Sequence, residues 1–458
     1  MNKDALVTRV RSQLSGLRNQ ETAVNGGRLP VPSTPGPCFL SPESPAPLTS
    51  GLRLLTPTPA ARLSVCVLAA CPFPANHGTP GSIREICEGL AELGHEVHIV
   101  TYHFGENIPL RGPRLHRIAD WTGESSVVVG PTKRRPLYDL QMVLKTLQVL
   151  RNHRPDLIHA HGYEAALIAW LCRCVHKLPV VYSGHNTMAD ELPSYNFIRP
   201  RWAAVGLAKA LDAVVPRLAD RCLPHSSNMA GFFRRLHLNG RTEPVVNFGI
   251  NLDWMDESGG ETIRRQYQLS DGPVLVYSGV LDEFQRLDLL LEAVAHIRLY
   301  EPTVKLLIVV TIANARQLAD LDRRARTLGI AKHVVVTEPQ PLERIRDFLA
   351  AADVAVVPRP GAPGFPIKLL NYWAAKKPVV LFASSASHGL RNGEHAMLAA
   401  PDTSVALGEA LLEVLRDPEL RQHLAGNGYQ FVRENHDRRV VAEQICSCYR
   451  RALESRTK

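Results

Sequence analysis

The sequence predicts an α/β protein built from two parallel sheets, each with helices on both faces. Its 458 residues are enough for two domains of ordinary size. From Leu63 onward, short apolar runs of strand length alternate with amphipathic runs of helix length, and this alternation is found in both halves of the chain. Each half is therefore expected to form a Rossmann-like domain, and the two should face each other across a cleft that holds the ligand.

The predicted elements of the first half follow one another as a parallel sheet requires. The apolar run LSVCVLAAC is a strand buried on both faces, and it leads through the loop PFPANHGTPG into the helix SIREICEGLAELG. After the strand HEVHIVTY come a basic helix over about residues 138–152, the strand DLIHAH, the helix EAALIAWLCRCVH, the strand LPVVYSGHN, an amphipathic stretch over 202–220 and the segment RCLPHSS. We expect a first domain over residues 63–250.

A polar, glycine-bearing stretch, NLDWMDESGG, marks the predicted boundary between the two domains. Beyond it come the strand VLVYSGV, the helix LDLLLEAVAHIRLY, the strand KLLIVVTI, a helix through Arg326, the strand HVVVTEP, a helix through Ala352, the strand VAVVPR, the helix IKLLNYWAAK and the strand KKPVVLFA. A second domain is expected over residues 251–430. A final helix over 431–458 should pack back on the first domain.

The first 62 residues differ in composition from the rest of the chain. The segment VPSTPGPCFLSPESPAPLTSG is rich in Pro, Ser and Gly and has no apolar period, so it should not bury enough surface to fold. We expect a disordered leader over residues 1–62. The spacing of its apolar residues allows one short amphipathic helix, over about residues 4–17.

Charge and cysteine content limit the partners and the compartment. The net charge of +9 favours phosphate-bearing small molecules or anionic lipid, and no nucleic-acid-binding module is recognisable, so we expect no nucleic-acid partner. Nine cysteines are scattered without a CxxC pair, which is typical of free thiols in a reducing compartment. No run of 18 apolar residues and no secretory signal is found, and the expected location is the cytoplasm.

Two basic patches lie in the first domain, at Lys133 to Arg135 and at Arg199 to Trp202. Arginine and lysine could dock on anionic lipid headgroups with Trp202 at the interface, which would place the protein peripherally on the inner face of the cytoplasmic membrane. A solvated basic surface without a partner is the alternative.

Several segments, in order, resemble GT-B glycosyltransferases of the family 4 or group 1 type. GFPIKLLNYWAAKKPVV is similar to their donor-binding segment, and PFPANHGTPGSIREICEGLAELGHEVHIVT, VVYSGHNTMADELPSY, YSGVLDEFQRLDLLLEA and AADVAVVPR resemble other segments in the family's order. The likeness covers about residues 63–450. It implies transfer of a sugar from a nucleotide-sugar donor with retention of configuration, no metal and no cofactor. The second domain would bind the donor, and the first would bind a carbohydrate, lipid or metabolite acceptor.

The resemblance places the donor site around Lys368. Lys368 matches a P-x-K pattern found in some members, in the first turn of a helix where a bound diphosphate would offset its charge. Asn371 stands where the family has a ribose-binding glutamate, and Pro363 replaces a glutamate that normally contacts the donor sugar. Phe365 and Pro366 belong to the same donor segment.

A second donor loop is expected from Gly279 to Arg286. The family has an arginine after this glycine and a Lys-Gly pair before the helix, whereas this chain has Val280, Gln285 and Arg286. Arg286 could supply the positive charge of the family's lysine, although it stands one position after the place of that lysine. The alternative is that Arg286 is a solvent-facing arginine at the start of a helix.

Histidines are the candidate catalytic residues of the first domain. His161 and His185 end two consecutive strands at the expected cleft, where an imidazole can exchange a proton or bond a hydroxyl near neutral pH. The resemblance implies that His185 lies near the donor sugar, and His159 should share the face of His161 but lie deeper in the sheet. The small residues Gly78, Thr79 and Gly81 should form a loop that lets a ligand approach the backbone.

Three further departures from the family pattern keep other functions open. Lys376 and Glu338 replace usual glycines, and VVTIANA lacks the glycines that normally end its strand. A catalytically silent binding or scaffold protein and a nucleotide-sugar epimerase of the same architecture are therefore the alternatives to a glycosyltransferase. Asp190 and Glu191 could bind acceptor hydroxyls, although an acidic pair at a helix start is the simpler interpretation.

Overall fold

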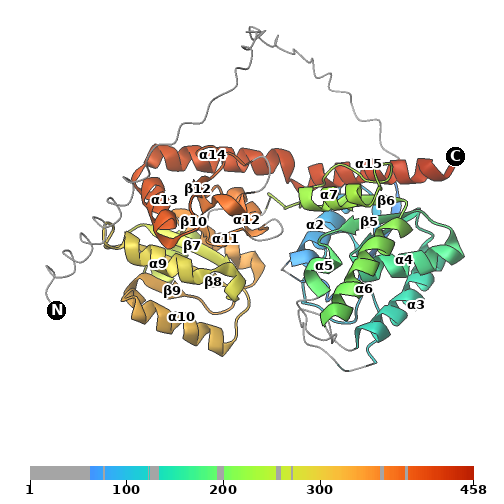
Figure 1. The fold of residues 1–458 in the computed structure, drawn as a ribbon, viewed down its shortest axis with the longest axis horizontal. Coiled ribbons are helices and arrows are strands. Elements are labelled where there is room, and N and C mark those ends of the chain that lie inside the picture. Colours follow the sequence, from blue (N-terminus) through green and yellow to red (C-terminus); the bar gives the residue numbers. More distant parts are fainter. Residues whose placement is uncertain are drawn as a thin grey trace, which may run out of the picture. The chain divides into compact units, whose positions relative to one another are not determined.

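The computed structural model describes residues 62–75, 78–121, 123, 134–192, 201–253, 259–269, 272–361, 366–386 and 390–457. The predicted leader, apart from Arg62, lies outside these residues. The described chain forms two α/β halves of Rossmann-like architecture, which confirms the predicted fold class (Figure 1).

The first half contains a parallel six-stranded sheet in the order β3-β2-β1-β4-β5-β6. Its strands are β1 (Ser64–Ala69), β2 (Glu96–Thr101), β3 (Arg114–Arg117), β4 (Leu157–His161), β5 (Val180–Gly184) and β6 (Arg221–Pro224). Its helices are α2 (Gly78–Glu92), α3 (Arg135–His153), α4 (Tyr163–His176), α5 (Met188–Glu191), α6 (Arg201–Val214) and α7 (Ser227–Arg235), with a 3-10 turn η2 (Val215–Leu218). The strand order reverses between β1 and β4, and ligands of such sheets bind beyond the carboxyl ends of the strands at this point.

The second half repeats this topology, with its own parallel six-stranded sheet in the order β12-β11-β10-β7-β8-β9. Its strands are β7 (Val274–Gly279), β8 (Lys305–Val310), β9 (Val334–Val336), β10 (Val354–Val357), β11 (Val379–Phe382) and β12 (Met397–Ala399). Its helices are α8 (Gly260–Gln266), α9 (Leu287–Ile297), α10 (Ala315–Thr327), α11 (Leu342–Ala350), α12 (Lys368–Ala374), α13 (Ser404–Arg416) and α14 (Pro418–Asn435), with 3-10 turns η3 (Glu283–Gln285), η4 (Ala331–His333) and η5 (Ala383–Ser385). Here the order reverses between β7 and β10.

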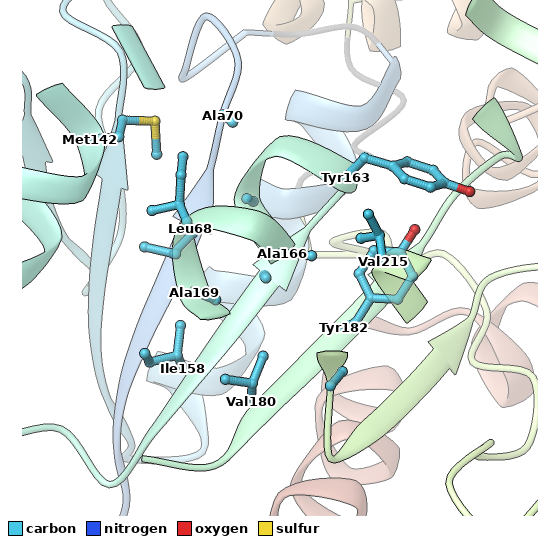
Figure 2. Close-up of a cluster of buried hydrophobic side chains, with 14 of the residues drawn as sticks. Leu68, Ala70, Met142, Ile158, Tyr163, Ala166, Ala169, Val180, Tyr182 and Val215 are labelled. Carbon is cyan, nitrogen blue, oxygen red and sulfur yellow. The ribbon is translucent and has the colours of Figure 1, made fainter. Parts of the chain in front are cut away.

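Each sheet is buried on both faces because alternate strand residues enter different cores. In β1, Cys66 and Leu68 pack toward α3 and α4, and Figure 2 shows part of this cluster. Val65 and Val67 enter a second core with α2 and the last helix, α15 (Arg438–Thr457). Strands buried on both faces need nearly continuous apolar runs, which is why the sequence pattern was a reliable guide to them.

The chain passes between the halves twice, and the two crossing segments are hydrogen bonded to each other. The Ile250 amide donates to the His436 carbonyl at 2.8 Å, and the Arg438 amide donates to the Ile250 carbonyl at 3.0 Å. After this crossing, α15 packs on α2 of the first half. The end of the chain therefore completes the core of the first half.

No helix in the described part of the chain is long and apolar enough to cross a bilayer.

Two differences from the predicted elements have simple causes. The edge strands β3 and β12 are short, and β3 carries two arginines in the sequence RLHR, so neither gives a long apolar run. The structure also corrects the loop predicted at Gly78, Thr79 and Gly81, because these residues form the first turn of α2. Pro80 makes this turn hard to recognise as helix from the sequence, because proline usually interrupts helices. Proline is nevertheless tolerated in the first turn of a helix.

The helix α12 ends in a turn that requires a left-handed backbone at Lys376, where φ is +52°. The Lys376 amide donates to the Trp373 carbonyl and the Lys377 amide donates to the Tyr372 carbonyl, which is the hydrogen-bond pair of a Schellman motif. The left-handed backbone explains why the family resemblance implies a glycine at this position. Lys376, which replaces that glycine in this chain, adopts the same kind of turn.

Lys376→Gly is expected to stabilise the protein by about 0.5 to 1 kcal/mol, because glycine adopts a left-handed conformation without the strain that a side chain brings. The exposed contact of the Lys376 ammonium with the Tyr429 ring, 5.2 Å from its centroid, offsets only a small part of this gain. A melting temperature at or below that of the wild type would contradict this account of the turn.

Candidate functional site

Lys368 lies at the carboxyl edge of the second sheet, beside the point where its strand order reverses. The Lys368 Nζ donates to Gln285 Oε1 at 2.8 Å and lies 4.0 Å from the centroid of the Tyr277 ring. Tyr277 belongs to β7, Gln285 to the turn η3 and Lys368 to the first turn of α12. Three elements from distant parts of the sequence therefore hold one ammonium group at the strand ends.

The charge of Lys368 is poorly compensated in the protein by itself. Burial and, to a smaller extent, the nearby Arg359 guanidinium lower the pKa of the Lys368 ammonium to about 7, and Asp282 acts in the opposite direction. Among the residues that the structure describes, no carboxylate forms an ion pair with Lys368. An anion bound here would restore the full positive charge, so the arrangement favours a phosphate-bearing ligand.

Gly279, the last residue of β7, is required by the position of this lysine. A Cβ at Gly279 would lie 3.0 Å from the Lys368 Nζ and 3.2 Å from the Tyr277 hydroxyl, and φ at this position is +142°. The structure therefore brings Gly279 and Lys368 together, two residues that were each predicted to belong to the donor site.

Arg286 is placed differently from Lys368. Its guanidinium forms a bidentate ion pair with the Asp288 carboxylate, with a nitrogen-to-oxygen distance of 2.9 Å. Its backbone has φ of +52°, so the glycine implied by the resemblance is again explained by conformation. A ligand phosphate would have to compete with Asp288 for this arginine. The preceding residue, Gln285, contacts Lys368 directly.

The remaining predicted donor residues surround α12. Asn371 is partly exposed and lies three residues after Lys368, on the same face of the helix. Pro366 is buried, and its carbonyl accepts a hydrogen bond from the Leu369 amide in the first turn. Pro363 and Phe365 lie outside the described residues.

In the first half, histidines from three consecutive strand ends lie together. The Nδ1 of His161 is 3.3 Å from the Nε2 of His185, and the His185 ring stacks on His225 with 4.7 Å between centroids. The Phe248 ring stacks on His225 in turn. His225 directly follows β6, so it occupies a strand end as His161 and His185 do, and this position is the signal by which the sequence could have identified it.

A chain of hydrogen bonds beneath this cluster fixes the tautomers. The His225 Nδ1–H donates to the Val246 carbonyl, which leaves its Nε2 to accept from the Ser183 hydroxyl at 3.0 Å. Ser183 Oγ then accepts from His159 Nε2–H at 2.8 Å, and the His159 Nδ1 accepts from the Tyr449 hydroxyl at 2.7 Å. Tyr449 comes from α15, so the C-terminal helix helps to position the strand ends of the first half.

Burial keeps the histidine cluster neutral near pH 7. Burial lowers the pKa of His161 and of His185 well below the ordinary value, and the neighbouring histidines add to this effect. The Nε2 of His161 is buried, and no partner for it is found in the part of the chain that the structure describes. At neutral pH these imidazoles can therefore hydrogen bond a hydroxyl but cannot act as cations.

The loop that carries His185 is anchored by Asp212 of α6. The Met188 and Ala189 amides donate to the Asp212 carboxylate at 2.8 and 3.0 Å, and the Tyr163 hydroxyl also donates to it. The Thr187 side chain caps α5, and Asp190 lies in the first turn of this helix. These bonds hold the backbone after β5 and so orient His185.

Of the two basic patches, the structure describes Arg134, Arg135, Arg201 and Trp202. Arg135 forms an ion pair with Glu164 at 3.1 Å, whereas the Trp202 side chain is 76% exposed. Lys133, Arg199 and Pro200 lie outside the described residues.

Lowering the pH from 7.5 to 5 is expected to destabilise the first half through its buried histidines. Burial lowers the pKa of His159 to about 3 and that of His225 to about 4, whereas both rise to about 6.5 on unfolding. The unfolded state therefore binds more protons below pH 6.5, and each histidine costs about 2 kcal/mol of stability at pH 5.

The measurement is urea unfolding at a series of pH values for the wild type and two variants. His225→Gln should reduce the dependence of stability on pH, whereas His237→Gln, at an exposed position, should leave it unchanged. Equal pH dependence in all three proteins would show that the buried histidines do not titrate in this way.

Comparison with known proteins supports the family resemblance. Residues 78–254 match the Glycosyltransferase Family 4 profile, and residues 272–417 match the profile of the Glycosyl transferases group 1 family. Together these two matched regions correspond to the two halves of the fold.

Relatives by sequence are named D-inositol 3-phosphate glycosyltransferases. The Streptosporangium roseum protein is 29% identical over 60% of this chain and 66% of its own length, so the match spans slightly less than two thirds of that relative. A Catenulispora acidiphila protein is 30% identical over 60% of this chain and 67% of its own length. The Thermobispora bispora protein is 26% identical over 81% of this chain and 89% of its own length.

Solved structures share the fold at low sequence identity. Sucrose-phosphate synthase from Thermosynechococcus elongatus has a TM-score of 0.70 and 20% identity over 86% of this chain and 100% of its own. Anabaena HepE, in complex with UDP and glucose, has a TM-score of 0.64 and 17% identity over 84% of this chain and 99% of its own.

Proposed function

Because the chain belongs to the group 1 family of glycosyltransferases, we propose that it transfers a glycosyl group from a nucleoside-diphosphate sugar to an acceptor hydroxyl with retention of configuration. The observation that carries the donor assignment is Lys368, a partly buried cation that lacks a carboxylate partner in the described chain and lies at the carboxyl edge of the second sheet.

The proposed role of Lys368 is to bind the diphosphate and stabilise it as the leaving group. Negative charge builds up on the diphosphate as its bond to the sugar carbon breaks, and a positioned cation stabilises that charge more strongly than the ground state. Gly279 leaves room for the lysine, and Asn371 would hydrogen bond the ribose from the same helix face.

The histidine cluster of the first half would bind hydroxyl groups at the reacting sugar. His185 and His161 are neutral at pH 7, which suits hydrogen bonding without a second charge beside the oxocarbenium-like sugar. As the bond between the sugar carbon and the acceptor oxygen forms, the acceptor proton would pass to an oxygen of the departing diphosphate. This balances the reaction without a protein base.

The relatives suggest which substrates to test first. HepE is described in complex with UDP and with glucose, and the sequence relatives are named for D-inositol 3-phosphate. A UDP-sugar as donor and an inositol phosphate as acceptor are therefore the first pair in a panel that also contains GDP-sugars and ADP-sugars, free inositol and simple glycosides.

The deciding experiment measures thermal stability with each nucleotide and then product formation with each acceptor. A ligand at 100 times its dissociation constant should stabilise the folded state by about 2.7 kcal/mol. Transfer that requires both substrates, with the anomeric configuration retained by NMR, would support the proposal. Nucleotide binding without turnover across the acceptor panel would favour the silent scaffold, and conversion of the donor without an acceptor would favour the epimerase.

A further inference from the structure

Three histidines outside the proposed transfer site lie together in the first half. They are His98 of β2, His116 of the edge strand β3 and His153 at the last position of α3. Each offers a ring nitrogen, and the three nitrogens all lie within 4.8 Å of one another. His98 is fully buried, whereas His116 and His153 are partly buried.

The arrangement of the rings is close to that of a three-histidine metal site. The Nδ1 of His98 and the Nε2 of His116 are 3.0 Å apart, and the His153 ring stacks on His98 with 4.2 Å between centroids. In a tetrahedral site with zinc-to-nitrogen distances of about 2.0 to 2.1 Å, the ligand nitrogens lie about 3.3 Å apart. The His98 and His116 nitrogens already have nearly this separation. The His153 nitrogen lies within 4.8 Å of both, and binding an ion would require its ring to turn out of the stack on His98.

Glu96 lies where the outer carboxylate partner of a metal-binding histidine is usually found. Its carboxylate lies 3.2 Å from the Nε2 of His98, the nitrogen that does not face His116. Arg114 holds the same carboxylate at 3.1 Å. A carboxylate at Nε2 favours the tautomer with its proton there, which leaves the lone pair of Nδ1 available for a metal.

The second histidine cluster meets the same distance criterion but is less suited to a metal. His161, His185 and His225 also have ring nitrogens within 4.8 Å of one another. Both nitrogens of His225 are already bonded, Nδ1 to the Val246 carbonyl and Nε2 to Ser183 Oγ. A metal there would have to break a hydrogen bond of His225 with Val246 or Ser183, whereas at the first cluster it would replace the hydrogen bond between its own ligands, His98 and His116.

We propose that His98, His116 and His153 bind one Zn²⁺ ion, with water in the fourth position and Glu96 orienting His98. The end of α3 precedes β4, so the site lies at the amino edge of the sheet, away from the strand ends that carry His161 and His185. The ion would fasten the edge strand β3 and the end of α3 to β2. Its role is therefore structural and does not depend on the proposed transfer reaction.

The test is zinc binding by the full-length protein after chelator treatment, measured by competition with a chromophoric chelator. The wild type should bind one ion per chain through this cluster, and Co²⁺ in its place should give the visible absorption of a tetrahedral site. Zinc should also raise the melting temperature. Glu96→Gln should weaken binding about 10- to 100-fold, and His153→Gln, which removes a ligand, should weaken it further.

Two variants serve as controls. His176→Gln changes a partly buried histidine at the last position of α4, matching His153 at the end of α3, and should bind zinc as the wild type does. His185→Gln tests the second cluster and should also keep the ion. The proposal is overturned if the wild type binds no zinc, if His153→Gln binds it as tightly as His176→Gln, or if His185→Gln alone loses it.

Discussion

Replacing Lys368 by methionine is expected to lower kcat/KM for sugar transfer by about 10²- to 10³-fold, the usual cost of removing one group that stabilises transition-state charge. Methionine keeps most of the side-chain volume beside the Tyr277 ring, so the fold should be retained. The measurement is steady-state kinetics with the donor that the panel identifies. Nucleotide affinity should fall as well, because the lysine also binds the ground-state diphosphate.

Two variants make this result interpretable. Lys332→Met removes an exposed lysine that precedes β9 at the amino edge of the same sheet, and it should leave kinetics unchanged. Gln285→Glu would place a carboxylate 2.8 Å from the Lys368 ammonium and should lower nucleotide affinity by competing with the diphosphate. If Lys368→Met retained wild-type kcat/KM, the assignment of Lys368 to the donor site would be wrong.

The same lysine should make nucleotide binding depend on pH. Burial and the Arg359 charge lower the pKa of Lys368 to about 7 in the free protein. A bound diphosphate favours the charged form and raises this pKa, so binding takes up a proton above pH 7. Affinity should therefore decline by up to about tenfold per pH unit between pH 7 and 9, and Lys368→Met should abolish this decline.

Arg438→Met is expected to destabilise the protein by about 3 to 5 kcal/mol, because it leaves the buried Glu88 carboxylate without its counter-charge. Arg438 is 2% exposed at the start of α15, and its guanidinium contacts three glutamates of α2. One nitrogen lies 2.7 Å from Glu88 and 3.3 Å from Glu85, and the other contacts Glu92. A neutral side chain of similar length would leave Glu88 without an ion-pair partner in the described chain, whereas Glu85 and Glu92 would keep Arg84 and Arg439.

Urea unfolding checks this expectation, with Arg439→Met as the matched control. Arg439 is the next residue in the chain and contacts Glu92 and Asp253, but its side chain is about half exposed, so its loss should cost at most about 1 kcal/mol. Equal effects of the two variants would mean that burial does not distinguish the two arginines. A protein that loses α15 packing should also become more sensitive to proteolysis near its C-terminus.

Much of the fold could be predicted because its main signals are local. Runs such as SVCVLA and VLVYSG are apolar throughout because both faces of their strands are covered, and the intervening helices have a clear amphipathic period. Short edge strands such as β3 gave no such signal, and proline in the first turn hid the start of α2 at Gly78.

The candidate site was only partly predictable. Lys368, His161 and His185 could be singled out from strand ends and a family-like segment, because the carboxyl ends of parallel strands meet at one edge. Gln285, Ser183 and Tyr449 could not, since their roles depend on which distant segments become neighbours. Arg286, one of the candidates for the missing charge, is paired with Asp288 and has a left-handed backbone, and its place in a motif revealed neither.

The sequence by itself determined that the chain forms two α/β halves with helices on both faces of each sheet, since hydrophobic period and strand length are set residue by residue. Tertiary structure decided the strand order, the return of α15 to the first half and the electrostatic state of the site residues. The low pKa of Lys368 and the neutrality of the histidines depend on burial and on charges brought from far along the chain. Side chains such as Arg438 and Glu88, 350 positions apart, acquire their effect only when the chain is packed.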